Sequence, residues 1–336
     1  MQNTSVRASK FSVAVVGGTG YSGQELIRLL KHHPHAEVTG SFNSTNVREL
    51  KARDYHAIFL ATPLETSLAL APEFLKQGAH VIDLSGAFRL PVGQITANYQ
   101  TWYKVEHSAP ELVMQAHYGL VPWKKALSPK TPQLVANPGC YASAVLLALL
   151  PLLQHPLIRP ESVVIDAKSG TTGAGKKAEE ALLFSEVDGE CLPYKIGTHQ
   201  HLPEITQWCQ LLTQTKIDPI FTTHLLPTRR GIIAGVYARL LPGKGLSDVQ
   251  TAFHEAYHSY PLVQHGETSN KKLLSLKSVV GTAMTHIAYQ VTGDKLHVFA
   301  TLDNLLKGAA SQAIENFNAL ADLPVNTGLT HLEALT

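Results

Sequence analysis

Cys140 is the residue of this sequence best suited to act as a nucleophile. It follows the turn-forming segment Asn137–Gly139 and precedes the apolar run 142–153, which predicts a buried helix that begins at about Tyr141. A thiol at a helix N-terminus has its thiolate stabilised by the helix dipole and by free backbone N–H groups. We therefore expect the pKa of Cys140 to be lowered, and we expect the same N–H groups to hold an oxyanion.

A pair of histidines in segment 199–204 (HQHLPE) is the predicted partner of this thiol. His199 and His201 lie two positions apart, so on an extended strand their rings point to the same side. Pro203 is predicted to end that strand and to let Glu204 turn back towards either ring. A cysteine and a histidine with a carboxylate behind the histidine form a usual activated-thiol arrangement, although a structural hydrogen-bonding pair fits the same spacing. No third ligand has a suitable local spacing, so we expect no zinc site.

The segment 17–23 (GGTGYSG) has the spacing of a dinucleotide-binding turn. It follows the apolar run 11–16 and precedes a helical pattern over 24–32, which is the context that the G-x-G-x-x-G motif requires. Glycines let the backbone approach a pyrophosphate, whose charge then meets the helix N-terminus; a tight turn without a ligand is the alternative. The residues expected to contact the cofactor here are Gly17, Thr19, Gly20, Tyr21, Ser22 and Gly23.

The end of the second predicted strand indicates which dinucleotide is bound. NAD sites usually place an acidic residue there, about 20 residues after the glycines, to hold the ribose hydroxyls. Segment 41–45 reads SFNST and contains no acid, but Ser41 and Ser44 supply hydroxyls and Arg48 follows as a cation. This pattern favours the 2′-phosphate of NADP, with Asp54 as the acid that a different loop geometry would bring in instead.

Two further features have anion-binding potential. The loop 169–176 (SGTTGAGK) could surround a phosphate with backbone N–H groups, but Lys177 stands where a P-loop requires Ser or Thr. Arg89 and Arg230 could each clamp a carboxylate or phosphate bidentately, although lone arginines more often form ordinary ion pairs. The residues expected at the substrate are Arg89, Asn137, Ser169, Gly170 and Arg230, and Gly173 is expected at the cofactor.

Strand-like and helix-like runs alternate in the first part of the chain and change in the second. The early strand candidates are 11–16, 37–42, 57–61 and 81–84, with helix-like stretches such as 65–77 between them. This alternation predicts parallel β-α-β units and an N-terminal Rossmann doubly wound sheet in an α/β protein. The later candidates, 163–167, 217–225, 232–240 and 296–302, are separated by longer loops and predict an α+β catalytic and dimerisation domain.

We divide the chain at the proposed nucleophile. Residues 1–140 are the expected NADP-binding Rossmann domain, and residues 141–302 are the expected catalytic and substrate domain. The final segment 303–336 is expected to pack back on the first domain, with 303–320 forming one helix.

The composition of the chain excludes some classes of function. The chain has 336 residues, of which 44% are hydrophobic and 16% charged, and its formal net charge is +2. A balance this even gives no large basic surface for nucleic acid. Three cysteines at long spacings, without a C-x-x-C pair, argue against disulfides and favour a reducing compartment. Cys191 and Cys209 are expected to be small buried hydrophobes.

No targeting or membrane segment is expected. Segment 1–10 is polar and lacks the apolar core and the small-residue cleavage site of a signal peptide. Apolar runs stay shorter than the roughly 18 residues that a transmembrane helix needs. We therefore expect a cytoplasmic protein that binds a small-molecule substrate, forms a homo-oligomer (a dimer or tetramer), and binds neither nucleic acid nor a membrane.

Six motifs together resemble one known family. They are 17–26 (GGTGYSGQEL), 83–90 (DLSGAFRL), 137–141 (NPGCY), 169–176 (SGTTGAGK), 199–205 (HQHLPEI) and 303–309 (DNLLKGA). The chain resembles the N-acetyl-γ-glutamyl-phosphate reductases of arginine biosynthesis over nearly its whole length. Aspartate-semialdehyde and glyceraldehyde-phosphate dehydrogenases share the plan of a Rossmann domain with a cysteine, but not the combination of NPGCY with H-x-H-x-P-E-I.

The resemblance implies an activity and roles for particular residues. It implies that Cys140 attacks an acyl phosphate, that phosphate leaves, and that the thioester is reduced by hydride from NADPH to N-acetylglutamate 5-semialdehyde. It makes His199 the acid–base residue, with His201 and Glu204 as supports. The residues that it places near the cofactor are Thr62, Pro63, Ser85, Gly86 and Asn304.

The sequence departs from the family pattern in three places. Gln200 stands where an arginine is expected, Thr171 and Thr172 occupy a stretch that is more often Val-Ser, and the region 43–54 is shorter. Two rival functions stay open. One is a reductase of a homologous acyl phosphate, such as an aminoadipyl or aspartyl type. The other is a non-catalytic NADP-sensing module, against which the intact Cys140 and histidine pair argue.

Overall fold

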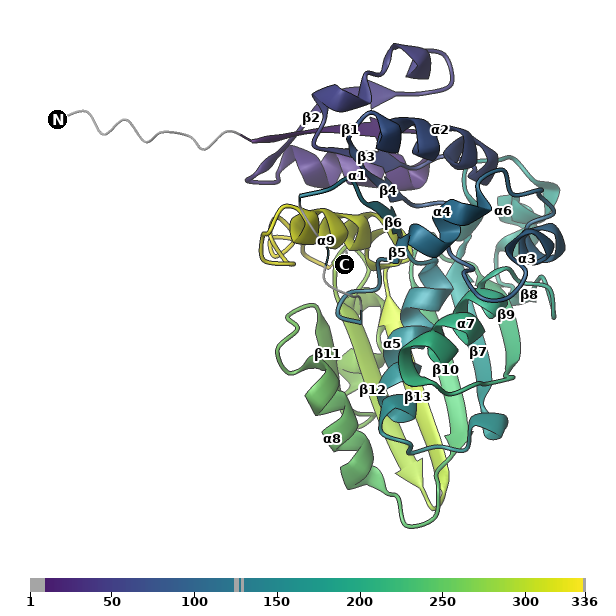
Figure 1. Cartoon of the computed structure of the whole chain (residues 1–336). Coiled ribbons are helices and arrows are strands. Elements are labelled where there is room, and N and C mark those ends of the chain that lie inside the picture. The colour runs from purple at the N-terminus through teal and green to yellow at the C-terminus, as the bar shows by residue number, and fades with distance from the viewer. Residues whose placement is uncertain (1–9, 124–126, 128–129, 335–336) are drawn as a thin grey trace.

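Two β-sheets, one in each part of the chain, organise the molecule (Figure 1). The computed structural model describes residues 10–123, 127 and 130–334. The predictions for segment 1–9, and for the last residues of the proposed C-terminal segment, 335–336, lie outside the described residues.

The first sheet is parallel throughout and runs in the order β2-β1-β3-β4-β6-β5. Its strands are β1 (Phe11–Val16), β2 (Ala36–Phe42), β3 (Ala57–Leu60), β4 (His80–Asp83), β5 (His117–Tyr118) and β6 (Leu134–Ala136). Strands β3 and β4 are buried at every residue, as befits strands covered on both faces. The strand order reverses between β1 and β3, and ligands of such sheets bind outside the carboxyl ends of the strands at that point.

Helices cover both faces of this sheet. They are α1 (Tyr21–Lys31), α2 (Leu64–Lys76), α3 (Ile95–Trp102) and α4 (Pro110–Gln115). Val13 and Val15 share a core with α1, whereas Ala14 and Val16 share another core with α2. Successive β1 side chains therefore face opposite helical layers, and the predicted Rossmann doubly wound sheet is confirmed.

The second sheet is mixed and runs in the order β11-β12-β13-β10-β7-β9-β8. Its strands are β7 (Val164–Gly170), β8 (Leu192–Pro193), β9 (Ile220–Leu226), β10 (Ile232–Arg239), β11 (Val263–Glu267), β12 (Thr285–Thr292) and β13 (Lys295–Leu302). The long strands β10, β12 and β13 pair antiparallel, while β7 pairs β9 in parallel. The predicted α+β architecture of the second part is confirmed.

Helix α5 (Cys140–Gln154) is the central helix of the second domain. Every residue from Tyr141 to Leu153 is buried, because the helix packs on β10 and β13 and is covered by α7 (His201–Thr213) and α8 (Leu246–Tyr257). A helix that is apolar all round has to be buried in this way. Its first residue, Cys140, lies at the junction of the two domains.

The remaining elements are short, apart from the last helix. They comprise α6 (Phe184–Val187) and the 3-10 turns η1 (Val47–Glu49), η2 (Ala52–Asp54), η3 (Pro160–Ser162), η4 (Thr171–Ala174), η5 (Glu180–Leu182), η6 (Lys271–Leu274) and η7 (Leu276–Ser278). A π-helical segment η8 (Leu306–Ala310) leads into α9 (Ser311–Leu320).

Helix α9 returns to the first domain, and in Figure 1 it lies between the two sheets. The single helix predicted over 303–320 is interrupted: helical structure begins only at Leu306, and its first turn is π-helical. Asp303 is the reason for this start, because its carboxylate accepts the N–H groups of Leu305 and Leu306. The domain limits at 140 and 302 stay a prediction.

Candidate active site

A cleft of about 830 Å³ lies where the two domains meet. Its walls come from the glycine-rich turn, the start of α5, the loop after β7, the segment before α7 and the start of η8. The sequence-predicted residues that line it are Gly20, Tyr21, Ser22, Thr62, Pro63, Arg89, Cys140, Ser169, Gly170, Gly173, His199, His201 and Asn304. Those that do not line it are Gly17, Thr19, Gly23, Ser41, Ser44, Arg48, Ser85, Gly86, Asn137, Glu204 and Arg230.

The glycine-rich turn forms a cradle at the start of α1. Gly17 has a φ of +86°, and a Cβ atom there would lie 2.2 Å from the carbonyl oxygen of Ala61, so only glycine fits. Helix α1 begins at Tyr21 without a side-chain cap on its free N–H groups. An uncapped helix N-terminus behind a turn without bulky side chains fits the pyrophosphate of a dinucleotide.

The predicted 2′-phosphate residues lie at the end of β2. Ser41 is in the strand and close to the glycine-rich turn, since a Cβ atom at Gly18 would lie 2.8 Å from its Oγ. Ser44 and Arg48 follow it and are exposed. Asp54, the alternative acid, lies in η2 and is 3.9 Å from Arg53 in an exposed ion pair.

The other predicted cofactor residues fall into two groups. Thr62 and Pro63 follow β3 directly and line the cleft. Ser85 donates to the buried carboxylate of Asp83 at 2.8 Å, and Gly86 packs against the ring of Tyr103. Ser85 and Gly86 therefore lie behind the residues that line the cleft after β4.

Cys140 lies at the N-terminus of α5, as predicted, and is the first residue of the helix instead of the residue before it, but the expected lowering of its pKa is wrong. Burial raises the pKa of Cys140 to about 11, although the N–H of Tyr141 and the charge of Arg89 act in the opposite direction. Desolvation of the thiolate outweighs the stabilisation that the helix end provides. Cys140 is therefore a neutral thiol at neutral pH in this structure.

Gly308 of the π-helical segment packs directly on this cysteine. A Cβ atom at Gly308 would lie 2.7 Å from the Cβ of Cys140. The middle of η8 and the start of α5 thus touch at the nucleophile, and only a residue without a side chain allows that approach.

The histidine segment is helical where a strand was predicted. Helix α7 begins at His201, and Pro203 lies inside its first turn, where proline is tolerated because the missing N–H has no helical partner. The two rings still meet, with centroids of His199 and His201 4.8 Å apart. His201 also packs its ring against Gly139, the residue before Cys140.

Both imidazoles are neutral in this environment. Burial lowers the pKa of His199 to about 3, and it lowers the pKa of His201 as well; the charge of Lys195 acts in the same direction on both. The Nδ1 of His199 accepts the backbone N–H of His201 at 3.1 Å. The proton of the neutral His199 ring is therefore on Nε2.

Glu204 does not turn back to a histidine, so that prediction is wrong. Its Oε1 accepts the N–H of Gly139 at 2.9 Å and the hydroxyl of Tyr118 at 2.8 Å. Its Oε2 lies 3.7 Å from Nη1 of Arg89. Because Glu204 lies in the first turn of a helix, its side chain extends beneath the turn that carries Cys140 instead of along a strand.

Arg89 and Asn137 support this same turn from within the protein. Arg89 donates from Nε to the carbonyl of Asn137 at 2.8 Å and from Nη2 to the carbonyl of Leu84 at 2.7 Å. The side chain of Asn137 donates to the carbonyl of Ala309 and accepts from Asn316, each at 3.1 Å. Both residues were predicted to bind substrate, but their polar atoms are occupied within the protein.

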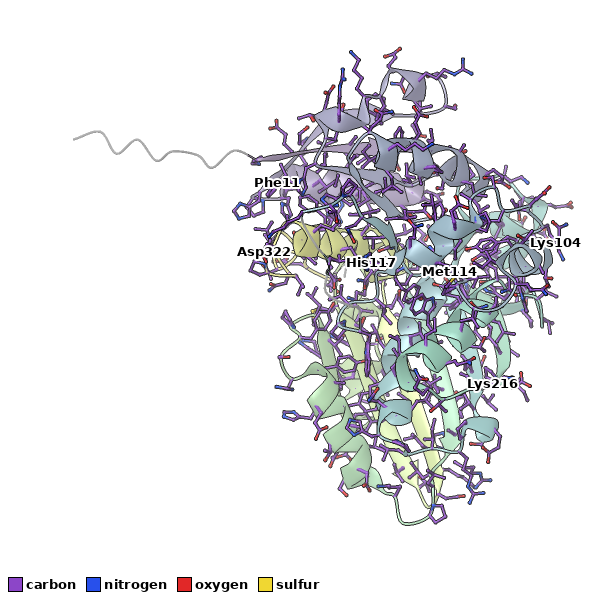
Figure 2. All side chains as sticks on the ribbon, viewed as in Figure 1. Phe11, Lys104, Met114, His117, Lys216 and Asp322 are labelled. Atoms are coloured by element: carbon purple, nitrogen blue, oxygen red, sulfur yellow. The ribbon has the colours of Figure 1, made fainter. Side chains whose placement is uncertain are left out.

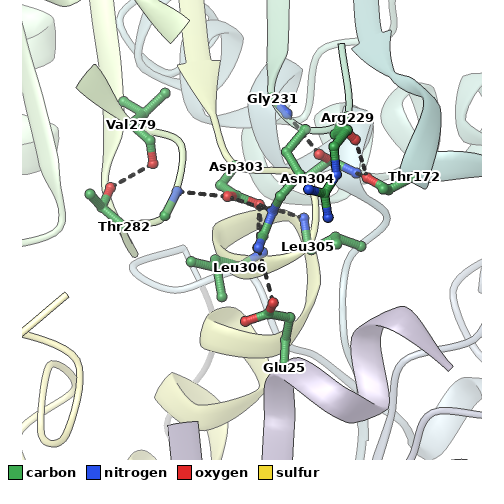
Figure 3. A network of polar contacts seen from close by, with 12 residues as sticks. Glu25, Thr172, Arg229, Gly231, Val279, Thr282, Asp303, Asn304, Leu305 and Leu306 are labelled. Atoms are coloured by element: carbon green, nitrogen blue, oxygen red, sulfur yellow. Dashed lines mark hydrogen bonds and ion pairs between the residues drawn. The ribbon is translucent and has the colours of Figure 1, made fainter. Parts of the chain in front are cut away.

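Arg230 lies in a network that joins the two domains. It contacts Glu25 of α1 at 2.9 Å and Asp303 at 3.0 Å. Figure 3 shows Asp303 and Asn304 at this junction; Asn304 accepts the N–H of Gly231 at 2.8 Å and donates to Thr172 at 3.0 Å. Arg230 was predicted to bind substrate, but it is engaged in this network and does not line the cleft.

Two residues of the cleft, Tyr141 and Lys195, were missed from the sequence, and Lys176 was marked only as the end of the anion-binding loop 169–176. Tyr141 packs edge-on against both histidines, with centroids 5.3 Å and 5.9 Å away, and its place in the NPGCY motif could have drawn attention to it. Lys176 donates to the carbonyl of Thr19 at 2.6 Å. Lys195 donates to Oε1 of Gln200 at 2.9 Å. Lys195 carries no local pattern that would have marked it.

The structure bears on three expectations about chemistry elsewhere. All three cysteines are free; Cys209 is buried as predicted, but Cys191 is exposed, so that expectation was wrong. Within the described ranges, no cluster of three or more His, Cys, Asp or Glu side chains is arranged to hold a metal ion. None of the described helices is both long and apolar enough to span a membrane.

Family models match both domains. Residues 12–57 and 42–127 match the NAD binding domain of semialdehyde dehydrogenases, and residues 140–304 match the semialdehyde dehydrogenase dimerisation domain. The first of these matches supports a nicotinamide cofactor.

Known structures share the fold. The chain matches aspartate semialdehyde dehydrogenase II of Vibrio cholerae, complexed with ASA, with a TM-score of 0.69 at 16% identity, over 94% of this chain and 99% of that chain. It matches the aspartate semialdehyde dehydrogenase with NADP of Candida albicans with a TM-score of 0.61 at 12% identity, over 93% of this chain and all (100%) of that chain. At these identities the likeness shows the fold alone.

Sequence relatives are closer. The N-acetyl-gamma-glutamyl-phosphate reductase of Bordetella avium (strain 197N) is 37% identical over 98% of this chain and 99% of that protein. The protein of the same name from Bacillus cereus (strain B4264) is 36% identical over 95% of this chain and 98% of that protein. The chain is therefore an oxidoreductase that belongs to the N-acetyl-gamma-glutamyl-phosphate reductase family.

Proposed function

We propose that this chain catalyses the NADPH-dependent reduction of N-acetyl-γ-glutamyl phosphate to N-acetylglutamate 5-semialdehyde through a thioester on Cys140, as a cytoplasmic step of arginine biosynthesis. One observation carries the proposal. Cys140, at the start of α5, shares a single cleft with the start of α1, where a dinucleotide fits, and with two neutral histidines. The names of the relatives supply the substrate.

The cofactor would lie along the first domain and cross into the second. When bound, its nicotinamide supplies hydride to the thioester. Gly17, Thr19, Gly20, Tyr21, Ser22 and Gly23 would hold the pyrophosphate, and Ser41, Ser44 and Arg48 would hold the 2′-phosphate of NADP. Thr62, Pro63, Ser85, Gly86, Gly173 and Asn304 would surround the rest.

Acylation starts from the thiol form of Cys140. Its sulfur attacks the acyl carbon, a C–S bond forms, and the bond from carbon to the phosphate oxygen breaks. The thiol proton passes through an imidazole of the histidine pair to the leaving group, which departs as HPO₄²⁻. A neutral thiol beside a neutral imidazole suits this transfer, because neither partner needs to be ionised beforehand.

Reduction and release use the same residues. The backbone N–H groups at the start of α5 stabilise the oxyanion that forms when the thioester carbon gains hydride. Collapse of this tetrahedral species breaks the C–S bond and releases the aldehyde. The departing sulfur leaves as a thiolate, to which the Nε2–H of His199 can donate a hydrogen bond until a proton from solvent regenerates the thiol. Ser169 and Gly170 line the cleft where the substrate chain would lie.

The second sheet supports assembly into a homo-oligomer, a dimer or tetramer. Tyr237, His297 and Phe299 alternate along β10 and β13 with the buried Val236 and Val298, so they project from the face opposite α5. They are only partly buried in the single chain. A second copy covering this face would agree with the dimerisation domain that the family model describes.

A panel assay tests the proposed function. NADPH consumption is followed with N-acetyl-γ-glutamyl phosphate, an N-acetyl-aminoadipyl phosphate and aspartyl phosphate, and each is repeated with NADH. The first compound with NADPH should give the highest kcat/KM. A higher value for another acyl phosphate would assign the chain to a sister reductase, and cofactor binding without any turnover would assign it to a sensor.

A further inference from the structure

The substrate of the proposed function is an anion, and it needs a cation near Cys140. The inference that follows rests on that proposed function. Among the described residues that line the cleft, three side chains carry a lysine or arginine charge: Arg89, Lys176 and Lys195. Their contacts decide which of them is free to meet the substrate.

The guanidinium nitrogens of Arg89 are all engaged by groups of the protein itself. Two of its nitrogens donate to the carbonyls of Asn137 and Leu84, and the third faces the carboxylate of Glu204. The side chains of Arg89 and Glu204 are 7% and 0% exposed. A buried arginine whose charge is balanced and whose donors are used positions backbone and has little left for a ligand.

Lys176 lies at the end of the cleft that the glycine-rich turn forms. Its ammonium donates to the carbonyl of Thr19 and lies 5.2 Å from the centre of the Tyr21 ring. Both partners belong to the glycine-rich turn of the first domain. Lys176 therefore lies where a dinucleotide phosphate would be held, away from the acyl carbon.

Lys195 lies at the other end, beside the histidines. Its ammonium donates to Oε1 of Gln200, the residue between His199 and His201. Its charge reaches both rings, since it contributes to the lowering of their pKa values. The side chain is exposed, and an ammonium has three donors, so this hydrogen bond leaves donors for an anion.

The backbone around Lys195 is fixed. Tyr194, the preceding residue, donates its N–H to the carbonyl of Thr223 at 3.0 Å, and its own carbonyl accepts the Thr223 hydroxyl at 2.6 Å. Lys195 has a φ of +46°, a conformation rare for a side-chain-bearing residue, and its carbonyl accepts the N–H of Thr198 at 3.0 Å. A strand edge and a tight turn thus aim this lysine at the cleft.

We infer that Lys195 binds the phosphate group of the acyl phosphate substrate. In the substrate that phosphate is bonded to the carbon that Cys140 attacks, so it must lie close to Cys140 and the histidines. Lys195 is the cation of the cleft that lies beside those histidines with donors to spare. It holds the leaving group where an imidazole can hand it the thiol proton.

The test compares Lys195→Met and Lys195→Arg with Lys216→Met. Lys216, which Figure 2 labels beyond the end of α7, is exposed and does not line the cleft. Loss of a charge-assisted hydrogen bond corresponds to about 10- to 100-fold in affinity. Lys195→Met should raise KM for the acyl phosphate by that factor, with kcat changed by less than about 3-fold. Lys195→Arg should recover most of the affinity, and Lys216→Met should match the wild type.

The reverse reaction identifies the group that is bound. With semialdehyde, inorganic phosphate and NADP⁺, Lys195→Met should raise KM for phosphate and leave KM for the semialdehyde unchanged. A raised KM for the semialdehyde alone would assign Lys195 to the substrate carboxylate and overturn the inference. So would a weakened Kd for NADP⁺ with unchanged phosphate KM.

A binding measurement keeps this test separate from the proposed function. Calorimetric titration of inorganic phosphate into the protein with NADP⁺ present needs no turnover. Weaker phosphate binding by Lys195→Met supports the inference even if the wild type reduces a different acyl phosphate, in which case only the proposed substrate falls. Equal phosphate affinity in Lys195→Met and wild type overturns the inference.

Discussion

The two walls of the catalytic cleft are built in opposite ways. The inner wall is the turn before Cys140 together with its support, Tyr118, Gly139, Arg89 and Glu204, which are buried and hydrogen-bonded to one another or to backbone; of these four, Gly139 and Arg89 line the cleft itself. The outer wall is segment 173–198, which is mostly exposed and leaves Leu183, Phe184 and Ile196 at the surface.

The difference separates side chains that position the nucleophile from side chains that can bind a ligand. The donors of the inner wall are used by carbonyls and by the Glu204 carboxylate, so they hold the nucleophile in place and few are left for a ligand. Lys176 and Lys195 of the outer wall each donate one hydrogen bond, Lys176 to Thr19 of the first domain and Lys195 to the nearby Gln200. Cations that are exposed and lightly engaged can exchange their protein partner for an anion.

The largest expected effect is the loss of the nucleophile. Cys140→Ser should reduce kcat by about 10³-fold or more, because a serine alkoxide is far harder to form than a thiolate. Binding of NADP should be unchanged. The matched control is Cys191→Ser, since Cys191 is exposed on the outer wall. Near-normal turnover of Cys140→Ser would rule out the thioester.

The inner wall is tested next by Glu204→Gln. The substitution removes the charge opposite Arg89 while keeping the shape, and breaking a buried ion pair costs roughly 3–5 kcal/mol of unfolding free energy. Urea denaturation measures it, with the exposed Glu180→Gln of the outer wall as control. If both variants lost equally little stability, the ion pair between Arg89 and Glu204 would not stabilise the inner wall.

The buried histidines predict a pH dependence of stability. A histidine whose folded pKa is lowered takes up a proton in the unfolded chain below about pH 6.5 but not in the folded one. Stability is therefore lost as pH falls from about 6.5 towards the folded pKa, which for His199 is about 3. The histidines whose pKa is lowered in this way are His33, His56, His107, His199, His201, His265 and His286.

Urea titrations at about pH 7.5 and about pH 5.5 measure this loss in the wild type and in His199→Asn. One such histidine contributes roughly 1.4 kcal/mol per pH unit below its unfolded pKa. The variant should therefore lose about that much less stability between the two conditions. An identical loss in both proteins would mean that His199 is not held neutral by burial.

Local sequence patterns predicted some parts of the cleft correctly and misjudged others. The glycine-rich turn and the start of α5 were predictable, because turn residues followed by an apolar run determine them locally. The segment 199–204 was misjudged because H-x-H suits a strand, while Pro203 and Glu204 suit equally the first turn of a helix.

Tertiary contacts decided what the sequence could not show. Glu204 meets Gly139, which lies 65 residues earlier, and burial by distant segments sets the pKa of Cys140. Arg230 faces Glu25 across the domain boundary, so its role depended on how the domains pack. Gln200, noted as a departure from the family pattern, turns out to accept a hydrogen bond from Lys195.

The smallest expected effect distinguishes the two lysines of the outer wall. Lys176 contacts the glycine-rich turn at the carbonyl of Thr19, so it should bind the cofactor, whereas Lys195 should bind the substrate. Lys176 is exposed, and exposed charges contribute little, so Lys176→Met should weaken NADP binding only about 3- to 5-fold. Its KM for the acyl phosphate should stay at the wild-type value, the reverse of the pattern expected for Lys195→Met. Fluorescence titration with NADPH, at low and high salt, measures the first quantity, and the salt dependence should shrink in the variant because a charge is lost. If Lys176→Met and Lys195→Met changed the same constant, the outer wall would act as one anion site and the division of its two ends would fail.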